Sequence, residues 1–539
     1  ERFPHKAAII CEDRRLAYGE LDCIANRFAH ALHAAGGRKG AKVAMLSRNL
    51  WQYGVVFFGA ARSGLVLVNV SVQYAPAELA FVLNKSDAEI LVYDAAFDDK
   101  VAAVLGDCPQ LRTLVRIGSD GAGGGDGGDG GDGGDGGGNG DGGSPVAAPA
   151  GASSLPPAST PRRIGFDQFI AGQPDMPPTI ALAETDPFCM TYTGGTTGRP
   201  KGVLCSHRAR AVTAHTVAVE EALDERDVVA IVTPLFHVAA LNIMFQPAIL
   251  VGASCVFVTP WAPERFMATC AAERITAAFM VPTQANTLVT HPQFDADALA
   301  SWRKLSFAGA PMPDWVQTEL KARLPELRLT QIYGQSEMGV LTALRDWYLP
   351  AKLGSIGRQA YNVDLALFKT DGSEAGPGEP GEIASRGDNL MLEYYKEPEQ
   401  TAAVRRPDGW MLTGDVGVRD ADGFVTLIDR AKDMLISGGE NIYPKEIENV
   451  LYELDAIAEC AVFGIPDDKW GEVPAAFVSL RPGATLDTER IVAHCRQRLA
   501  EFKRPRLVRL VDDFPKTPIG KIQKNLLKEP FWSGRQKKI

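Results

Sequence analysis

The sequence has no Cys-x-x-Cys pair, no uncharged apolar run of about 18 residues and no excess of basic residues. Its nine scattered cysteines argue against a zinc site and a disulfide framework, and favour buried, reduced thiols. Without a long apolar run we expect no membrane-spanning segment, and reduced thiols favour a cytoplasmic location. The formal net charge of −10 argues against a nucleic-acid-binding protein that relies on overall basic charge.

The length of the chain, 539 residues, exceeds what one hydrophobic core supports, so we expect two or more domains. Between residues 21 and 94, segments of helical periodicity alternate with short apolar runs. The run at 42–47 is expected to form a strand, and the segment at 51–63 a helix. This alternation predicts an α/β fold in which helices cover both faces of a parallel sheet. Residues 365–428 are richer in strand and turn signals, and the residues beyond 430 indicate a small α+β domain.

One segment interrupts this pattern, because between Gly121 and Gly143 the chain has sixteen glycines and five aspartates. A calcium-binding Gly–Asp repeat is one interpretation, but such repeats need a regular apolar residue in each turn, and the sequence has none there. We therefore expect residues 118–160 to form a disordered surface insertion, since they offer nothing apolar to bury.

A loop at residues 193–201 has the composition of a phosphate-binding site. Its glycines free backbone N–H groups to face an anion, its threonines add hydroxyl donors, and its lysine adds a mobile positive charge. The residues concerned are Thr193, Gly194, Gly195, Thr196, Thr197, Gly198 and Lys201. The order differs from that of a Walker A loop, and a polar hairpin without a ligand is the alternative interpretation.

The string YTGGTTGRPKGV at residues 192–203 resembles the signature loop of the adenylate-forming superfamily, which includes acyl-CoA synthetases, luciferases and adenylation domains. The style is closest to 4-chlorobenzoate–CoA ligase and fatty-acyl-CoA ligases, and the resemblance covers nearly all of the chain except about residues 118–160. In that family the loop holds the β- and γ-phosphates of ATP while a carboxylate attacks the α-phosphorus. The family commonly has serine where this chain has Gly194, which removes one hydroxyl donor and leaves the backbone donors.

The resemblance also implies how the chain divides into domains. Residues 1–430 correspond to the AMP-binding domain, with α/β sheet subdomains and a small β-rich subdomain, and residues 431–539 to a small mobile α+β domain. Lys432 is implied as the hinge, and Gly438 and Gly439 are implied to line the passage for pantetheine, which side chains would block. Lys521 is the implied catalytic lysine, in contact with the carboxylate and the α-phosphate. The alternative for Lys521 is one more basic residue in a basic tail.

The pentapeptide YGQSE at residues 333–337 resembles the nucleotide motif of the same family. The resemblance implies that Tyr333 stacks on adenine beside Gly334, that Ser336 offers a hydroxyl to the α-phosphate, and that Glu337 binds Mg²⁺. A solvated surface charge is the alternative for Glu337. The other implied nucleotide contacts are Gly309, Ala310 and Pro311 at adenine, and Asp415 and Arg430 at the ribose.

His237 stands one residue after Phe236, where amino-acid-activating members of the family place an aspartate for the α-ammonium group. A buried ammonium without a carboxylate is costly, so we expect an acid without an α-amino group. His237 joins Glu337 and Lys521 as a catalytic candidate, with a core histidine as the alternative. The positions implied to line the acyl pocket fit an aromatic ring or an alkyl chain, and they are Val238, Ala239, Asn242, Met280, Val340 and Asn441.

Two segments of the C-terminal part resemble the coenzyme A segments of acid–CoA ligases. The first contains Trp470 and the second contains Phe502, Arg504 and Arg506. The two aromatic side chains are implied to flank an adenine ring, and the two arginines to meet phosphates.

Together these residues imply an ATP-dependent acid–CoA ligase that uses ATP, Mg²⁺ and coenzyme A. It first forms an acyl-adenylate and pyrophosphate, and then an acyl-CoA thioester and AMP, from an aromatic or fatty acid. Two alternatives stay open: an adenylating enzyme that loads a carrier protein, and a catalytically inactive nucleotide-binding regulatory protein. The sequence leaves the oligomeric state open, with a homodimer as one option.

Overall fold

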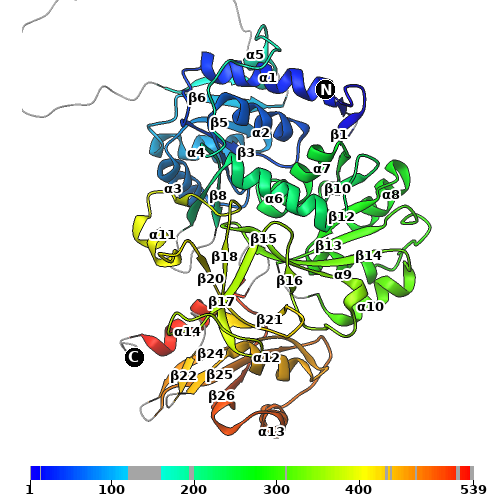
Figure 1. The fold of residues 1–539 in the computed structure, drawn as a ribbon, viewed down its shortest axis with the longest axis vertical. Coiled ribbons are helices and arrows are strands. Elements are labelled where there is room, and N and C mark those ends of the chain that lie inside the picture. The colour runs from blue at the N-terminus through cyan, green and yellow to red at the C-terminus, as the bar shows by residue number, and fades with distance from the viewer. Residues whose placement is uncertain are drawn as a thin grey trace, which may run out of the picture.

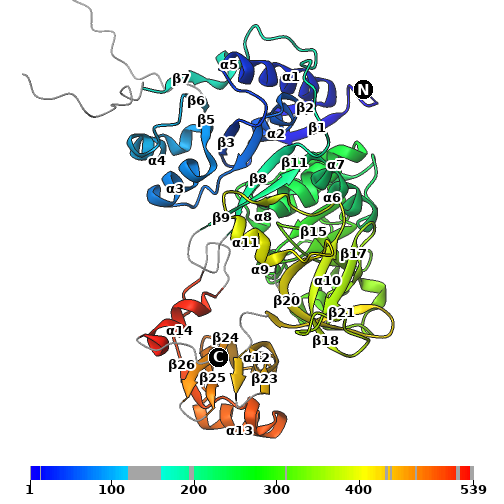
Figure 2. The same cartoon turned by 60° about the vertical axis from the view of Figure 1, so that its left-hand side comes forward.

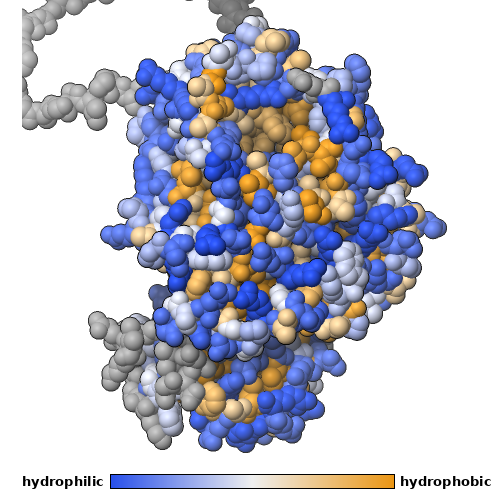
Figure 3. Space-filling view, in the orientation of Figure 1, coloured by the Kyte–Doolittle hydropathy of each residue, from blue (hydrophilic) through white to orange (hydrophobic). Residues whose placement is uncertain are grey.

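The computed structural model describes residues 2–12, 14–118, 160–193, 200–309, 312–430, 435–437, 440–467, 470–516 and 522–533. A large body carries two long sheets, and a small unit with its own sheet follows at one end of the long axis (Figures 1 and 2). Across these ranges no helix is both long enough and apolar enough to cross a membrane. The view in Figure 3 shows a mainly hydrophilic face, with hydrophobic residues gathered below α1 (Tyr18–Ala34) and near α7 (Gln246–Val251).

The first sheet has eight strands in the order β19–β9–β8–β4–β3–β5–β6–β7. Its strands pair in parallel except at β8–β9 and β9–β19, which are antiparallel. The strands are β3 (Lys42–Leu46), β4 (Val66–Asn69), β5 (Ala88–Asp94), β6 (Thr113–Ile117), β7 (Arg162–Gly165), β8 (Pro187–Thr193), β9 (Lys201–Ser206) and β19 (Glu393–Tyr394).

Helices cover both faces of this sheet because its central strands are apolar on both sides. In β3, Val43 packs in one hydrophobic cluster with residues of α1 and α2 (Trp51–Ser63), and Ala44 packs in another with residues of α3 (Pro76–Ser86). Two shorter helices, α4 (Asp98–Val104) and α5 (Phe166–Ile170), complete this part. This is the arrangement that continuous apolar strands predict.

The second sheet has thirteen strands in the order β17–β18–β20–β21–β16–β15–β14–β13–β12–β10–β11–β1–β2. Along this order, the pairs from β1–β11 to β13–β14 are parallel. The pairs from β14–β15 to β17–β18 are antiparallel. They are β1 (Ala7–Cys11), β2 (Arg14–Ala17), β10 (Val228–Ile231), β11 (Ser254–Phe257), β12 (Ala277–Met280), β13 (Lys304–Phe307), β14 (Arg328–Gln335), β15 (Gly339–Arg345), β16 (Gly357–Gln359), β17 (Asp364–Phe368), β18 (Pro380–Arg386), β20 (Met411–Arg419) and β21 (Phe424–Arg430).

The parallel part of the second sheet is also covered on both faces. One face packs against α8 (Pro263–Glu273), α9 (Pro282–Val289) and α10 (Asp314–Arg323), and the other against α6 (His207–Glu220), the π-helix η3 (Ala239–Phe245) and α7. A short helix α11 (Pro398–Val404) follows β19, and 3₁₀ turns include η4 (Asp346–Tyr348).

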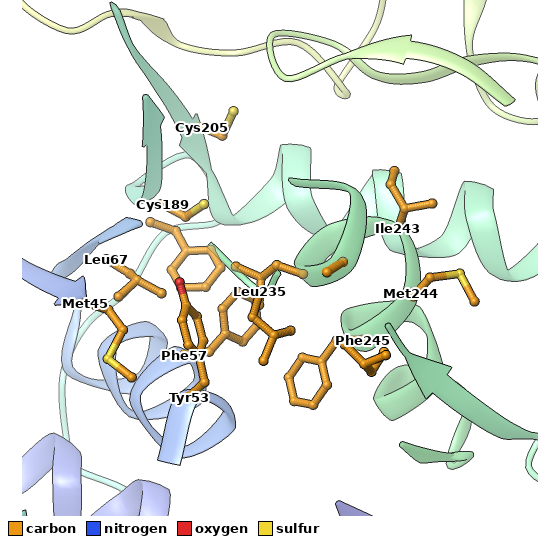
Figure 4. Packing of buried hydrophobic residues seen from close by; sticks show 14 of the residues in the cluster. Met45, Tyr53, Phe57, Leu67, Cys189, Cys205, Leu235, Ile243, Met244 and Phe245 are labelled. Carbon is orange, nitrogen blue, oxygen red and sulfur yellow. The ribbon is translucent and has the colours of Figure 1, made fainter. Parts of the chain in front are cut away.

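The two long sheets share one hydrophobic cluster (Figure 4). Phe57 of α2 lies with its ring centroid 5.0 Å from that of Phe188 in β8 and 6.3 Å from that of Phe245 in η3. Phe245 in turn contacts Phe257 of β11 at 5.9 Å. Aromatic contacts of this kind therefore fix η3, which follows His237, between the two sheets.

The C-terminal unit is a small α+β structure with five strands, β22 (Leu435–Ser437), β23 (Glu440–Ile442), β24 (Ile457–Asp467), β25 (Gly471–Leu480) and β26 (Leu507–Leu510). One cluster joins the sheet to α12 (Pro444–Tyr452) and α13 (Thr488–Arg498), and a second joins it to α14 (Lys524–Trp532). The predicted α/β class, with a β-rich region and a small α+β unit, is confirmed. The predicted insertion at 118–160 lies outside the described residues except at its two ends.

Candidate active site

The hairpin of β8 and β9 carries the predicted phosphate loop at its tip. Thr193 and Lys201 are cross-strand partners and close the hairpin. The predicted loop residues between them, Gly194, Gly195, Thr196, Thr197 and Gly198, lie outside the described residues. The ammonium group of Lys201 lies over the ring of Tyr394, with Nζ 4.9 Å from the ring centroid.

The hairpin of β14 and β15 carries the motif at residues 333–337. It is so tight that a Cβ atom on Gly334 would lie 2.0 Å from the carbonyl oxygen of Gly339. Real Cβ atoms essentially never approach backbone this closely, so only glycine fits the position. The close turn places Tyr333, Ser336 and Glu337 at one end of the sheet, all three partly buried.

Tyr333 and Asp415 meet although they lie on different hairpins. The Tyr333 hydroxyl donates to Asp415 Oδ2 at 2.7 Å, and Gln335 Nε2 donates to the same oxygen at 3.0 Å. Gln335 Nε2 also donates to the carbonyl of Thr413 at 2.8 Å, which ties the two hairpins together. The predicted adenine and ribose contacts are thus brought into one place. Arg430 is the cross-strand backbone partner of Asp415, and its side chain lies outside the described part.

A further carboxyl group stands beside this pair, since Glu382 Oε1 accepts the backbone N–H of Gly414 at 2.9 Å. Burial raises the pKa of Glu382 above its usual value, and the charge of Asp415 acts in the same direction. Glu382 and Asp415 therefore form a pair of neighbouring carboxyl groups at the turn of residues 413–415.

Glu337 is held by Tyr394, a residue that the sequence analysis did not select. The Tyr394 hydroxyl donates to Glu337 Oε1 at 2.8 Å. Burial, reinforced by the Glu337 carboxylate, raises the pKa of Tyr394 well above its usual value, so the hydroxyl keeps its proton as a donor. Gln335 stands inside the YGQSE motif, whose other residues were selected, whereas Tyr394 lies in β19, from which no residue was selected.

Glu337 also fits the predicted role of a magnesium ligand. It is partly exposed, and its carboxylate is the hard oxygen donor that Mg²⁺ prefers. Among the described residues, no three or more His, Cys, Asp or Glu side chains gather into a group that could hold a metal ion. A single carboxylate is compatible with Mg²⁺, because this ion takes most of its ligands from substrate phosphates and water.

Gly309 follows β13 and is the described member of the predicted adenine segment, while Ala310 and Pro311 lie outside the description. Its φ of +86° is a backbone conformation that favours glycine, and, chain neighbours apart, no atom of the described residues lies within 4 Å of the position of a Cβ. The backbone there is open to a flat ligand.

His237 lies at the start of the turn that leads into η3. Its Nδ1 accepts the backbone N–H of Ala239 at 3.2 Å, which makes Nε2 the protonated nitrogen of the neutral ring. Burial lowers the pKa of His237, so the ring is neutral at pH 7. A histidine ring carries no negative charge that could pair with an ammonium group. This agrees with the expectation of an acid that has no ammonium group.

The predicted acyl-pocket positions are only partly brought together. Ala239 and Val340 pack in the cluster shared by the two sheets. Val238, which precedes Ala239, is partly buried. Asn242 is fully buried in η3, with Nδ2 donating to Gln246 Oε1 at 3.0 Å. Met280 packs instead in the cluster on the opposite face of β12, while its neighbour Phe279 lies in the shared cluster.

The predicted coenzyme A residues lie on the C-terminal unit. Trp470 and Phe502 are 42% and 37% exposed, so both rings are available to a ligand. The Arg504 guanidinium donates to the carbonyls of Leu499 and Arg496, at 3.0 and 3.2 Å, and so closes the end of α13. Arg506 is exposed. Lys432, Gly438, Gly439 and Lys521 lie outside the described residues, as does the side chain of Asn441.

Comparison with known proteins gives a large N-terminal match followed by a smaller C-terminal one, in the order of the two parts of the fold. Residues 1–395 match the family model of the AMP-binding enzymes, and residues 446–521 match that of the AMP-binding enzyme C-terminal domain. The chain is similar to a feruloyl-CoA synthase of Amycolatopsis sp, with 34% identity over 98% of this chain and 96% of that protein. It is similar to a long-chain-fatty-acid–CoA ligase of Mycobacterium tuberculosis, with 31% identity over 96% of this chain and 94% of that protein. The ATP-bound crystal structure of MatB from Rhodopseudomonas palustris superposes with a TM-score of 0.81 at 26% identity, over 98% of this chain and 96% of that one.

Proposed function

Because the chain belongs to the AMP-binding enzyme family, it is an AMP-forming acid–thiol ligase, and we propose that it joins an aromatic or fatty carboxylic acid without an α-amino group to coenzyme A. The observation that carries the proposal is the contact between Tyr333 and Asp415, at 2.7 Å, beside the Glu337–Tyr394–Lys201 group. Segments 82 residues apart thereby present an aromatic ring and an acid to one nucleotide.

The first half-reaction is in-line attack at phosphorus. The substrate carboxylate oxygen bonds to the α-phosphorus of ATP while the bond to the bridging oxygen of pyrophosphate breaks, which gives acyl-adenylate and pyrophosphate. In this proposal the tip of the β8–β9 hairpin and Lys201 hold the β- and γ-phosphates, and Ser336 meets the α-phosphate. Glu337 would hold Mg²⁺, which neutralises phosphate charge when bound.

Lys521 is proposed to stand between the carboxylate and the α-phosphate, two anions that repel each other as they approach. A fixed positive charge at that point stabilises the transition state more than the separated reactants. Tyr333 and Asp415 orient adenosine, and the open backbone at Gly309 receives the adenine ring. These residues position the reactants, which is most of what phosphoryl transfer requires.

In the second half-reaction the thiol sulfur of coenzyme A bonds to the acyl carbon. The bond from that carbon to the phosphate oxygen of AMP breaks, and the thiol proton passes to solvent. We propose that residues 431–539 rotate as a domain about Lys432 and bring Gly438 and Gly439 to the acyl group. Trp470, Phe502 and Arg506 would then face the nucleotide part of coenzyme A, while Arg504 remains bound to α13.

The choice of acid rests on the surroundings of His237. Its neutral ring, followed by Val238 and Ala239, offers no partner for an ammonium group. The packing of Ala239 and Val340 in the shared cluster supports an apolar acyl group. The two relatives whose names specify a feruloyl and a long-chain fatty acid bracket the range of acids proposed.

A panel of benzoic, cinnamic and C6–C16 fatty acids tests the proposal, with acid-dependent pyrophosphate exchange and AMP release as the readouts. Coenzyme A and a phosphopantetheinylated carrier protein are compared as acceptors. We expect exchange with at least one aryl or fatty acid, no exchange with amino acids, and thioester formation with coenzyme A. Exchange that fails with every acid, or thioester formation with the carrier protein alone, would overturn the proposal.

Three further proposals concern the molecule as a whole. We place the domain boundary at residues 430 and 431, where β21 ends and the second family match has not yet begun. The nine free cysteines support a reducing, cytoplasmic location. A homodimer is one option for the assembly, which light scattering of the purified protein would test.

A further inference from the structure

Tyr394 touches two of the proposed ATP-binding groups at once. Its hydroxyl donates to Glu337 Oε1 at 2.8 Å, and its ring lies under Lys201, with Nζ 4.9 Å from the centroid. The side chain is only 8% exposed, so both contacts are made in a partly dehydrated setting. The acidic group lies at the hydroxyl and the basic group at the ring face, which suits the charge distribution of a phenol.

The backbone around Tyr394 is fixed on both sides. Strand β19 pairs with β9, with Tyr394 opposite Val203, and the N–H of Tyr395 donates to the carbonyl of Gly202 at 2.8 Å. Before the strand, the N–H of Met391 donates to the carbonyl of Glu337 at 2.7 Å. The same short segment therefore crosses from the 333–337 motif to the base of the phosphate hairpin.

We infer that Tyr394 is a positioning residue that holds Glu337 and Lys201 in the geometry required by the triphosphate and its magnesium ion. This inference rests on the proposed nucleotide site and adds a residue to it. The hydroxyl bonds one oxygen of the Glu337 carboxylate and so limits the rotation of the group. The ring holds the ammonium group of Lys201 near the hairpin before ATP arrives, which reduces the ordering needed on binding.

The two contacts also reinforce each other. A phenol that donates to a carboxylate gains electron density on its oxygen and ring, and an electron-rich ring attracts an ammonium group more strongly. The removal of the hydroxyl alone is therefore expected to act mainly on the metal-dependent part of ATP binding. The removal of the ring is expected to weaken both the metal-dependent part of ATP binding and the part that depends on Lys201.

Tyr395, the residue directly after β19, supplies a matched control. Its hydroxyl donates to Asp87 Oδ2 at 2.8 Å, and Lys42 Nζ lies 4.9 Å from its ring centroid. Asp87 is the C-cap residue of α3 and Lys42 lies in β3, so Tyr395 makes the same pair of contacts with residues outside the candidate site. Tyr394→Phe and Tyr395→Phe thus remove the same atom from the same kind of contact.

The experiment measures ATP binding by isothermal titration calorimetry at a series of Mg²⁺ concentrations and in EDTA, without acid or coenzyme A. For Tyr394→Phe we expect the half-saturating Mg²⁺ concentration to rise about tenfold, as on loss of a hydrogen bond to a metal ligand. The dissociation constant in EDTA is expected to stay within about twofold, because Lys201 keeps its ring. Tyr394→Leu is expected to weaken binding in EDTA as well, and Tyr395→Phe to change neither value.

A double-mutant cycle with Glu337→Gln separates positioning from general stability. If Tyr394 acts through Glu337, the effect of Tyr394→Phe on the Mg²⁺ requirement disappears in the Glu337→Gln background. An equal effect in both backgrounds, or a Tyr394→Phe variant that matches the wild type, would overturn the inference. Wild-type protein that binds Mg-ATP but activates no acid would remove the proposed substrate and leave this inference standing. Wild-type protein that binds no ATP would remove both.

Discussion

Glu221 ends α6 as a buried carboxyl group. Glu221 is only 5% exposed, and its Oε1 has no hydrogen-bond partner among the described atoms. Burial raises the pKa of Glu221 to about 7, although Ser306, Arg345 and Lys304 act in the opposite direction. The unfolded chain binds this proton only below the ordinary value of 4.5. Folding therefore keeps a proton that the unfolded chain releases as the pH rises.

We expect Glu221→Gln to stabilise the protein at neutral pH and to leave it unchanged near pH 4.5. Between pH 4.5 and about 7 the unfolded state loses the proton first, so the wild-type stability falls as the pH rises through this window, by about 3 kcal/mol in all. Glutamine cannot ionise and does not show this loss. The Tm difference between variant and wild type should grow from near zero at pH 5 to about 3 °C at pH 8.

Glu225→Gln is the matched control, since its carboxylate is 45% exposed and the substitution removes the same charge from a nearby position. A Tm difference for Glu221→Gln that is constant across the pH range would contradict the assignment of a buried acid. Differential scanning fluorimetry in a constant-ionic-strength buffer series provides the measurement, because charge effects at the surface vary with salt.

At the same scale, motif residues and their contacts differ in how far a sequence can predict them. The string at 192–203 and the YGQSE motif led directly to Lys201, Tyr333 and Glu337. Asp415 was selected for the ribose, but its bond to Tyr333 was not predicted, and Tyr394 was not selected at all, because these partners lie 82 and 57 residues away along the chain. Met280 shows the reverse case, since its position along the chain was suggestive but its side chain lies on the other face of β12. The roles of the site residues stay predictions.

Among the secondary-structure elements, the β14–β15 hairpin is the one on which the candidate site depends most. Gly334 lies opposite Val340 where the register of the two strands shifts, and a Cβ would lie 2.0 Å from the Gly339 oxygen. Tyr333 precedes this point and Glu337 follows it. Any separation of the strands here therefore moves both of these side chains.

We expect Gly334→Ala to weaken Mg-ATP binding by at least about tenfold, since the strands must part by about 1 Å or more and the 2.7 Å bond between Tyr333 and Asp415 is lost. Crowding of this kind is also expected to cost about 1–3 kcal/mol of stability. Gly165→Ala is the control, because no atom of the part of the chain that the structure describes, chain neighbours apart, lies within 4 Å of its Cβ position. Fluorescence titration with Mg-ATP and a parallel Tm measurement check both effects. Wild-type affinity in a folded Gly334→Ala protein would contradict this account of the hairpin.

Local patterns predicted individual elements well where the apolar signal was continuous. The helix expected at 51–63 is α2, and the strand expected at 42–47 is β3, which ends at Leu46. Helix α13 ends at Arg498, because Arg504 binds the carbonyls at its end and a 3₁₀ turn, η5 (Glu501–Lys503), follows. The π-helix η3 was not predicted, since its apolar sequence is compatible with an ordinary buried helix.

For the whole molecule, long-range pairing decides what the sequence could not show. The β-rich strands join the parallel strands in one thirteen-stranded sheet, and β1 pairs with β11 next to the edge strand β2. The two-residue strand β19 pairs with β9 almost two hundred positions earlier and so completes the candidate site. Periodicity reports which face of a strand is apolar, but it does not identify the neighbouring strand. The sequence predicted a covered parallel sheet, a β-rich region and a small α+β unit, whereas the combination of their strands into sheets was not predictable.

The division of the chain into a large body and a C-terminal unit gives the proposed reaction two geometries. Lys521 serves only the first of them in this proposal, because its charge is needed while two anions approach and not while a neutral thiol attacks. We expect Lys521→Ala to slow adenylate formation by about 10²–10³-fold or more. Thioester formation from chemically supplied acyl-adenylate should stay within about threefold of wild type, because coenzyme A supplies the nucleophile and the enzyme only positions it.

Lys516→Ala provides the comparison, because Lys516 is a nearby lysine whose ammonium group is already paired with Glu459 at 2.7 Å. Its removal is expected to leave both half-reactions close to wild type and to lower stability slightly, as for a surface ion pair. Rapid-quench assays of each half-reaction separate the two steps. If Lys521→Ala slows both steps equally, Lys521 takes part in both half-reactions. That result would contradict a domain rotation that withdraws Lys521 before the thiol attacks.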